Sequence, residues 1–183
     1  MRTAFTRRRE SQRGFSILEM MFATVILLVG LVAIAQLVPA SILLNYRNRT
    51  DSSALVFAQR ELDQFLDQPL NSSSFPDALG NVCQLGNPAV TNTVQGTNVL
   101  LYSNPWNPND ARAVIDFTSS VPGYTFTFQD PTDPSGTTYD IRWAVIVTGN
   151  NGTPNAKRFI LGVRQAGGNG YFQPITLDTM VAK

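Results

Sequence analysis

The chain has 183 residues and a formal net charge of +1, with 14 Lys and Arg against 13 Asp and Glu. It contains no His and one Cys, which excludes a Ser-His-Asp triad, metal sites built on His or on Cys clusters, and an intrachain disulfide. Five of the Arg residues lie in residues 1–14, so the rest of the chain is slightly acidic, and we expect no direct binding to nucleic acid.

A long uncharged tract follows this basic leader. Residues 20–38 carry no charged side chain, and a helix of that length approaches the roughly 30 Å hydrocarbon core of a bilayer. The tract exceeds the apolar core of a secretory signal, so we expect a single retained span of the inner membrane. The positive-inside rule then places the N-terminus in the cytoplasm and the head outside. Pro39 follows directly and is a candidate kink or end of the helix.

The residues between leader and tract form a signal. These residues, in order, are Gly14, Phe15, Ser-Ile-Leu and Glu19, and they follow basic residues and precede an uncharged run. This pattern resembles the class III signal of type IV pilins and type II secretion pseudopilins. The resemblance implies that a prepilin peptidase cleaves after Gly14 and methylates the new N-terminus to N-methylphenylalanine at Phe15. The resemblance covers the leader and the apolar tract.

Glu19 is a carboxylate placed at the start of a membrane segment. An ionised carboxylate in hydrocarbon costs several kcal/mol unless it is paired. Cleavage would create a positive amine at Phe15, and residues four apart face each other on a helix. Glu19 can therefore neutralise its own terminus or that of a neighbouring subunit, so we expect it to guide docking. The alternative is an interfacial residue at the start of an ordinary anchor.

The helical period continues past the membrane tract and predicts an amphipathic helix over residues 40–70, which packs on its own domain. The polar residues Arg60, Glu61, Asp63, Gln64 and Asp67 stand between the apolar ones. Asp-Ser-Ser at residues 51–53 has the composition of a helix cap, which leaves open a break near residue 51. The apolar stripe consists of Leu55, Ala58, Leu62, Phe65 and Leu66.

Residues 71–110 are rich in Pro, Asn and Ser and are expected to form a loop-rich connection. One short strand is predicted at residues 100–102. Long loops often mediate interactions, and Trp106 lies between two Asn-Pro turns, which makes it a candidate interface residue. The alternative is that Trp106 pins the loop to the sheet. Cys83 is expected to be a buried, unreactive residue.

Residues 111–183 show β-branched and aromatic residues with partial alternation, which predicts an antiparallel sheet. Tyr124, Phe126 and Phe128 should share one face of a strand. The segment NNGTPNA reads as the loop of a hairpin between TYDIRWAVIVTG and KRFILGVRQ. That strand pair resembles PilV/GspI-type minor pilins. The further expected strands are RAVIDFTS, GYTFTFQ and ITLDTMVA.

The expected fold is α+β and pilin-like: a long N-terminal helix, half membrane-spanning and half amphipathic, on a C-terminal antiparallel β-sheet. The chain divides accordingly into five segments. They are a cleaved leader over 1–14, a transmembrane and assembly helix over 15–39, an amphipathic helix over 40–70, a loop-rich region over 71–110 and a sheet region over 111–183.

No motif marks a catalytic site, so we expect a protein that is not an enzyme and needs no cofactor. Asp130, Asp133 and Asp140 are weak candidates for a calcium site, because Asp-Pro and Ser-Gly pairs are strong turn signals.

The leading hypothesis is a minor pilin or pseudopilin whose partners are prepilin peptidase, other pilin-type subunits and the inner membrane. The alternatives are a single-pass membrane-anchored extracytoplasmic binding or enzymatic domain, and a receptor or adhesin displayed through the pilin signal.

Overall fold

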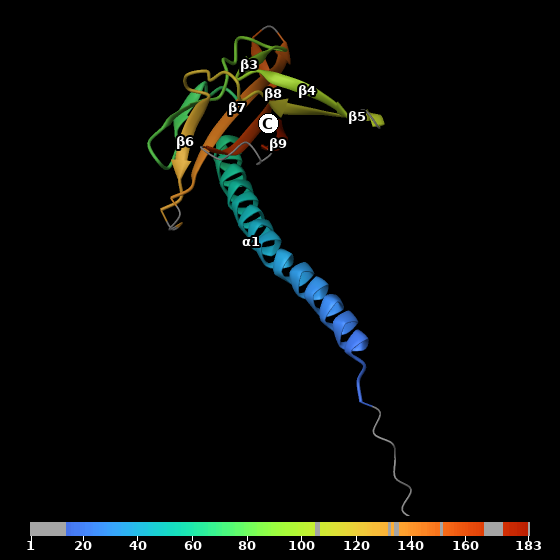
Figure 1. Cartoon of the computed structure of the whole chain (residues 1–183). Helices are drawn as coiled ribbons and strands as arrows, with labels where there is room; N and C mark the ends of the chain where they lie inside the picture. Colours follow the sequence, from blue (N-terminus) through green and yellow to red (C-terminus); the bar gives the residue numbers. More distant parts are fainter. Residues whose placement is uncertain are drawn as a thin grey trace, which may run out of the picture. The chain divides into compact units, whose positions relative to one another are not determined.

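The structure is a computed structural model that describes residues 14–104, 107–131, 133, 136–150, 152–166 and 174–182 (Figure 1). The chain divides into two compact units, Met1–Tyr46 and Arg47–Lys183. Along the chain the elements are α1 (Ile17–Asp67), β1 (Ser74–Pro76), β2 (Val82–Gln84), β3 (Val94–Gly96), β4 (Val99–Asn104), β5 (Asn107–Ile115), β6 (Thr125–Gln129), β7 (Thr138–Asn150), β8 (Thr153–Ala166) and β9 (Ile175–Ala182).

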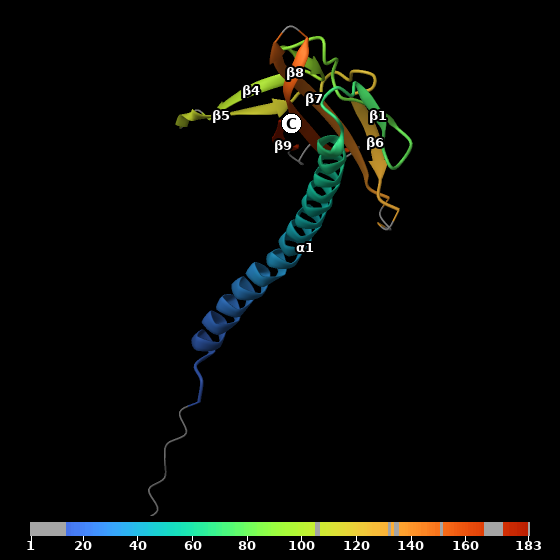
Figure 2. The ribbon, with the colours of Figure 1, turned by 180° about the vertical axis from the view of Figure 1, so that it is seen from behind.

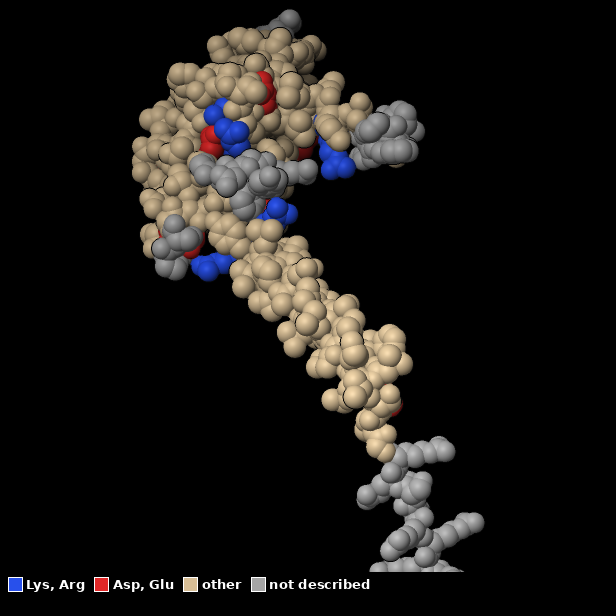
Figure 3. Space-filling view, viewed as in Figure 1, with Lys and Arg blue, Asp and Glu red and all other residues tan. Residues whose placement is uncertain are grey.

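The described part of the first unit is the beginning of helix α1 and the three residues before it. Every residue from 14 to 46 is solvent-exposed, and this stretch includes a long series of Leu, Ile, Val, Met and Phe side chains. Figure 3 shows it almost entirely free of charge. A helix with apolar side chains around its whole circumference requires lipid or other helices around it. It is the one described helix long and apolar enough to cross a membrane.

Helix α1 neither ends at Pro39 nor breaks near residue 51, although both positions were candidates. Pro39 lies inside the helix, where it removes one backbone N–H without interrupting the helical assignment. The helix ends at Asp67, two residues before Pro69, in agreement with the predicted end.

The second unit is built on an antiparallel five-stranded sheet. Strands β3, β7, β8 and β9 follow one another in that order. Strand β6 also pairs with β7, and the two lie side by side in Figure 2. The last turns of α1 pack on one face, through Ala58, Leu62 and Phe65. The expected α+β architecture, a long N-terminal helix on a C-terminal antiparallel sheet, is therefore confirmed.

Both faces of the two central strands are buried. Trp143, Val145 and their alternate neighbours on β7 face α1, whereas Ala144 faces the opposite side together with Ile160 of β8. The base of the two-stranded sheet formed by β4 and β5 packs on that side and buries these residues. This explains why the middle of β7, residues 143–147, is continuously apolar rather than alternating.

The buried stripe of α1 differs from the predicted one at two positions. Leu55 is 37% exposed, and Ala54 is buried in its place. Glu61, assigned to the polar side, is 1% exposed. The stripe runs through residues four apart, Ala54, Ala58 and Leu62, so the prediction of Leu55 as its first member was wrong.

The region expected to be loop-rich contains more strand than predicted. The strand over residues 100–102 is confirmed within β4, but β1, β2 and β3 add short pairings and β5 already begins at Asn107. The expected strand RAVIDFTS ends early, at Ile115. Asp116 Oδ1 accepts hydrogen bonds from the Thr118 N–H (2.8 Å) and hydroxyl (2.7 Å), which makes a turn in place of the strand.

The β7–β8 hairpin is tighter than the predicted loop. Asn150 pairs directly with Thr153, so the connection is confined to residues 151–152, and Gly152 has φ of 76°. A bulge between Thr148 and Gly149 shifts the register of the rest of the hairpin by one residue.

The aromatic strand follows the prediction. Phe128 is buried, and Tyr124 and Phe126 pack against the same cluster, so the three share the core side of β6.

Candidate processing and assembly site

Helix α1 begins immediately after the signal residues. The Met20 N–H donates to the Ser16 carbonyl at 3.2 Å, which closes the first turn and places Ser16 at the N-cap. Glu19 lies three residues later, where its negative charge is favourable beside the partial positive charge of a helix N-terminus. Ser-Ile-Leu-Glu is therefore also a capping-box pattern, a local signal that our sequence analysis missed.

The bond between Gly14 and Phe15 lies outside the helix and is accessible. Residues 14–16 have no regular secondary structure, and all three are exposed. Apart from Gly14 and its two neighbours in the chain, no described atom lies within 4 Å of the position that a Cβ on Gly14 would take. A protease needs its substrate backbone unfolded and reachable, and this segment satisfies both conditions.

Glu19 has no charged neighbour in the following part of the helix. No Lys, Arg, Asp or Glu occurs from Met20 to Tyr46, and no described residue forms a salt bridge with Glu19. The carboxylate can therefore be neutralised by a terminal amine or by a group from outside the described chain. An unpaired carboxylate beside an apolar helix is costly in lipid.

The remaining predicted site residues do not gather around one point. Trp106 lies outside the described residues. Asp133 forms an ion pair with Arg49 of α1 (3.5 Å), and the Asp133 N–H donates to the Asp130 carbonyl at 3.2 Å in a turn. Asp140 lies apart on β7 and is engaged by arginines. Within the described residues no group of three or more Cys, Asp or Glu side chains is arranged to hold a metal ion.

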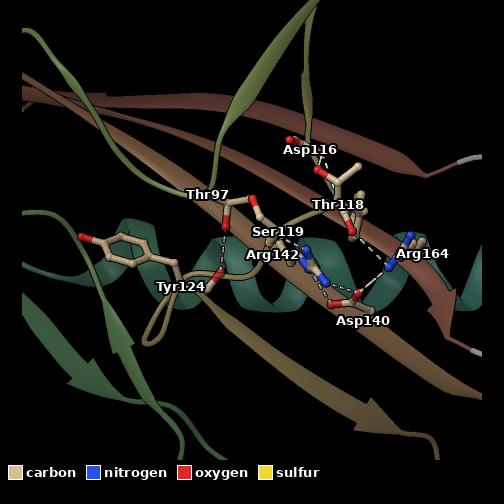
Figure 4. A network of polar contacts seen from close by, with 9 residues as sticks. Thr97, Asp116, Thr118, Ser119, Tyr124, Asp140, Arg142 and Arg164 are labelled. Carbon is tan, nitrogen blue, oxygen red and sulfur yellow. Dashed lines mark hydrogen bonds and ion pairs between the residues drawn. The ribbon is translucent and has the colours of Figure 1, made fainter.

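Asp140 is the centre of a polar network on the sheet face opposite α1 (Figure 4). It accepts hydrogen bonds from Arg142 (3.0 Å) and Arg164 (3.1 Å), and Phe117 stacks against both guanidinium groups, 5.2 and 4.6 Å from its ring centre. Arg142 also donates to the Ser119 carbonyl at 2.6 Å. The network ties the segment after β5 to the sheet, so these charged residues have a structural role.

A second polar group lies buried between α1 and the β1–β2 hairpin. Glu61 Oε1 accepts a hydrogen bond from Arg60 at 3.2 Å, while Oε2 is buried without a partner among the described residues. Burial raises the pKa of Glu61. Burial, assisted by the negative charges of Asp77 and Glu61, raises the pKa of Cys83 to about 12. The Cys83 thiol is therefore protonated and buried at neutral pH, which fits the expected unreactive residue.

The match to one protein-family model agrees with the N-terminal geometry. Residues 9–35 match the family model described as the prokaryotic N-terminal methylation motif. The comparison with curated proteins and the comparison with solved structures each gave no match. The matched segment contains Gly14, Phe15 and Glu19 and the first turns of α1. The chain thus carries the N-terminal signal of a pilin-type substrate of a prepilin peptidase, joined to a single long apolar helix.

Proposed function

We propose that this chain is a minor pilin or pseudopilin: a non-enzymatic structural subunit of a type IV filament system. It inserts into the inner membrane with its N-terminus in the cytoplasm, is cleaved after Gly14 and is methylated at Phe15. It then leaves the membrane for a bundle of parallel helices. The observation that carries the proposal is the methylation motif, placed on an accessible segment directly before a helix that is apolar on all sides.

Glu19 acts as the docking residue in this proposal. Its carboxylate is satisfied when the subunit reaches the Phe15 amine of a neighbour, which removes the cost of an unpaired charge in an apolar surrounding. The apolar face of residues 20–38 exchanges lipid for neighbouring helices at the same time. A minor rather than a major subunit is favoured by the likeness of β7 and β8 to PilV/GspI-type strands. In those strands Tyr139 and Trp143 are core residues.

The first test is intact mass and N-terminal peptide mapping of the protein from its native membrane. A chain that begins at methylated Phe15 supports the proposal. A chain that retains Met1–Gly14 in cells with an active prepilin peptidase refutes it and favours a membrane-anchored extracytoplasmic domain.

The docking role needs a separate test. Glu19→Ala should be cleaved like the wild type and yet be lost from filaments, because only docking depends on the carboxylate. Glu61→Gln, a second change of a carboxylate on α1, is the control and should assemble normally. Normal assembly of Glu19→Ala would contradict the docking role.

A further inference from the structure

Helix α1 and the β1–β2 hairpin enclose one carboxyl group between them. Glu61 of α1 is 1% exposed. Its Oε1 accepts a hydrogen bond from Arg60, whereas its Oε2 is buried without a partner among the described residues. A buried carboxylate oxygen without a donor is costly, and protonation of the carboxyl group removes the charge that makes it so. The interface therefore favours the neutral form of Glu61.

Arg60 compensates the charge of an ionised Glu61 only in part. Its guanidinium reaches one of the two carboxylate oxygens, at 3.2 Å. The Arg60 side chain is 43% exposed, and its guanidinium also lies over the Phe128 ring, 5.2 Å from the ring centre. Water screens an exposed cation, so Arg60 stabilises the buried carboxylate less than an enclosed partner would. Burial consequently raises the pKa of Glu61 in spite of Arg60.

A second carboxylate lies in the turn at the tip of the hairpin, close enough to act on Glu61. Asp77 is 6% exposed, and it accepts hydrogen bonds from the Leu79 N–H (2.9 Å), the Asn81 N–H (2.6 Å) and the Asn81 side-chain amide (2.8 Å). These bonds hold the turn together. The negative charge of Asp77 adds to the effect of burial on the pKa of Glu61. Two neighbouring carboxylates in a poorly hydrated interface repel each other when both are ionised.

The tip of the hairpin is held on α1 less firmly than its base is held on the sheet. The tip donates a hydrogen bond to the helix, from the Ala78 N–H to Gln64 Oε1 at 3.1 Å, and both groups are neutral. At the base, the Gln84 carbonyl accepts a hydrogen bond from the enclosed indole N–H of Trp143 at 2.8 Å. The charge state of Glu61 therefore acts where the hairpin is easiest to lift.

We propose that the β1–β2 hairpin is a proton-dependent strap over helix α1. The hairpin lies closed on the helix while Glu61 is protonated. When Glu61 ionises, its carboxylate and that of Asp77 repel across the interface, and lifting of the hairpin admits water to both. The head is therefore closed more tightly in acid than at neutral pH. This inference goes beyond the proposed function and does not depend on it, because it concerns the head alone.

The direction of the pH effect follows from the protonation of Glu61 in the two states. Burial raises its pKa above the ordinary value of 4.5 in the closed head, and lifting of the hairpin restores the ordinary value. The contribution of Glu61 to closure is complete below that ordinary value. It is lost as the pH rises through the pKa of the closed head.

Cys83 reports the position of the hairpin. It is the only cysteine of the chain, it lies on β2, and it is 0% exposed, so a thiol reagent reaches it only when the hairpin lifts or the head unfolds. It is also the remaining titratable group beside Glu61. Its thiol is neutral at and below pH 7, because burial raises its pKa to about 12.

The test follows the labelling of Cys83 by dithiodipyridine, which reacts with thiols in acid as well as at neutral pH, on the full-length chain in detergent micelles. The labelling rate of the wild type, divided by that of Glu61→Gln, should rise about threefold or more between pH 4 and pH 7, because the variant stays neutral throughout. The division cancels the pH dependence of the reagent. Asp63→Asn changes an exposed acid on the same helix, and it should follow the wild type. A ratio that stays constant overturns the inference.

Low concentrations of urea separate lifting of the hairpin from unfolding of the whole head. Lifting exposes little surface, so the labelling rate at pH 7 should hardly change below the unfolding transition. A labelling rate that increases with urea as steeply as global unfolding does would assign the effect to the whole head, and it would also overturn the inference.

Discussion

Lys157 is a buried amine whose ionisation should make the stability of the head depend on pH. It is 2% exposed on β8 and donates a hydrogen bond to the Ser72 carbonyl at 2.5 Å, just after the end of α1. No described carboxylate forms a salt bridge with it. Burial lowers the pKa of Lys157 from its ordinary value of 10.5 to about 8. The folded protein therefore binds fewer protons than the unfolded chain between these two values.

Stability should consequently rise with pH above neutrality. The contribution of Lys157 to the free energy of unfolding is complete at a pH above its pKa in the unfolded chain. It is lost as the pH falls through its pKa in the folded protein. With pKa values of about 8 and 10.5, going from pH 7 to pH 9 adds about 1.3 kcal/mol to the free energy of unfolding. Cys83 has the opposite effect on stability, because folding raises its pKa from 9.0 to about 12. Between pH 7 and pH 9 it lowers the free energy of unfolding by about 0.4 kcal/mol.

Lys157→Met isolates the effect because the Cys83 contribution is common to both proteins. Urea unfolding of the full-length proteins in detergent micelles, followed by tryptophan fluorescence at pH 7, 8 and 9, gives the free energies. The free energy of unfolding of the wild type, relative to that of the variant, should increase by about 1.3 kcal/mol between pH 7 and pH 9.

Arg158→Gln is the matched control on the same strand. Arg158 keeps its charge throughout this interval, because the carboxylate of Asp178 raises its already high pKa. The control should shift stability without changing its dependence on pH. Parallel curves for wild type and Lys157→Met would refute the reasoning, since they would mean that the amine ionises as it does in water.

Three further changes probe the head by the same unfolding assay. Glu61→Gln should raise the urea midpoint at pH 7 relative to wild type, because burial raises the pKa of Glu61 and makes its ionised form unfavourable in the folded protein. A wild-type midpoint that stays unchanged from pH 4 to 7 would contradict this prediction. Trp143→Phe should cost about 2–3 kcal/mol, because it leaves a cavity and removes the indole N–H that donates to the Gln84 carbonyl at 2.8 Å; a loss below about 1 kcal/mol would show that the site relaxes. Gly149→Ala should cost about 2 kcal/mol or more, because a Cβ would stand 2.0 Å from the Thr153 carbonyl oxygen; a wild-type midpoint would speak against the tight bulge.

The elements with a strong local signal could be predicted from the sequence. The uncharged tract, the signal around Gly14 and the aromatic alternation of Tyr124, Phe126 and Phe128 each depend on residues close together in the chain. The matched methylation motif falls on this local pattern. The short strands β1 to β3 could not be predicted, because three residues carry too little periodicity to distinguish a strand from a loop.

Features that depend on the register of long-range strand pairing could not be predicted from the sequence. Continuing the pairing of Asn150 with Thr153 without interruption would place Val163 opposite Asp140. The bulge at Gly149 shifts this by one residue and brings Arg164 to Asp140 instead. The network around Asp140 therefore depends on a backbone irregularity with no clear signature in the sequence.

The burial of Glu61 was likewise hidden. A polar residue in an amphipathic pattern is normally assigned to solvent, and only the placement of the β1–β2 hairpin over α1 reveals that this one is enclosed.

The same bulge divides the β7–β8 hairpin into two parts of unequal importance. Beyond it lie only the pairs of Gly149 with Pro154 and of Asn150 with Thr153, whereas the ladder that carries the core begins at Thr148 and Ala156. A peptide inserted between Asn150 and Thr153 would strain only the two outer pairs, and the inner ladder would keep its register. The tip of this hairpin is thus the place to attach an epitope or a fluorophore for following single subunits in a living cell.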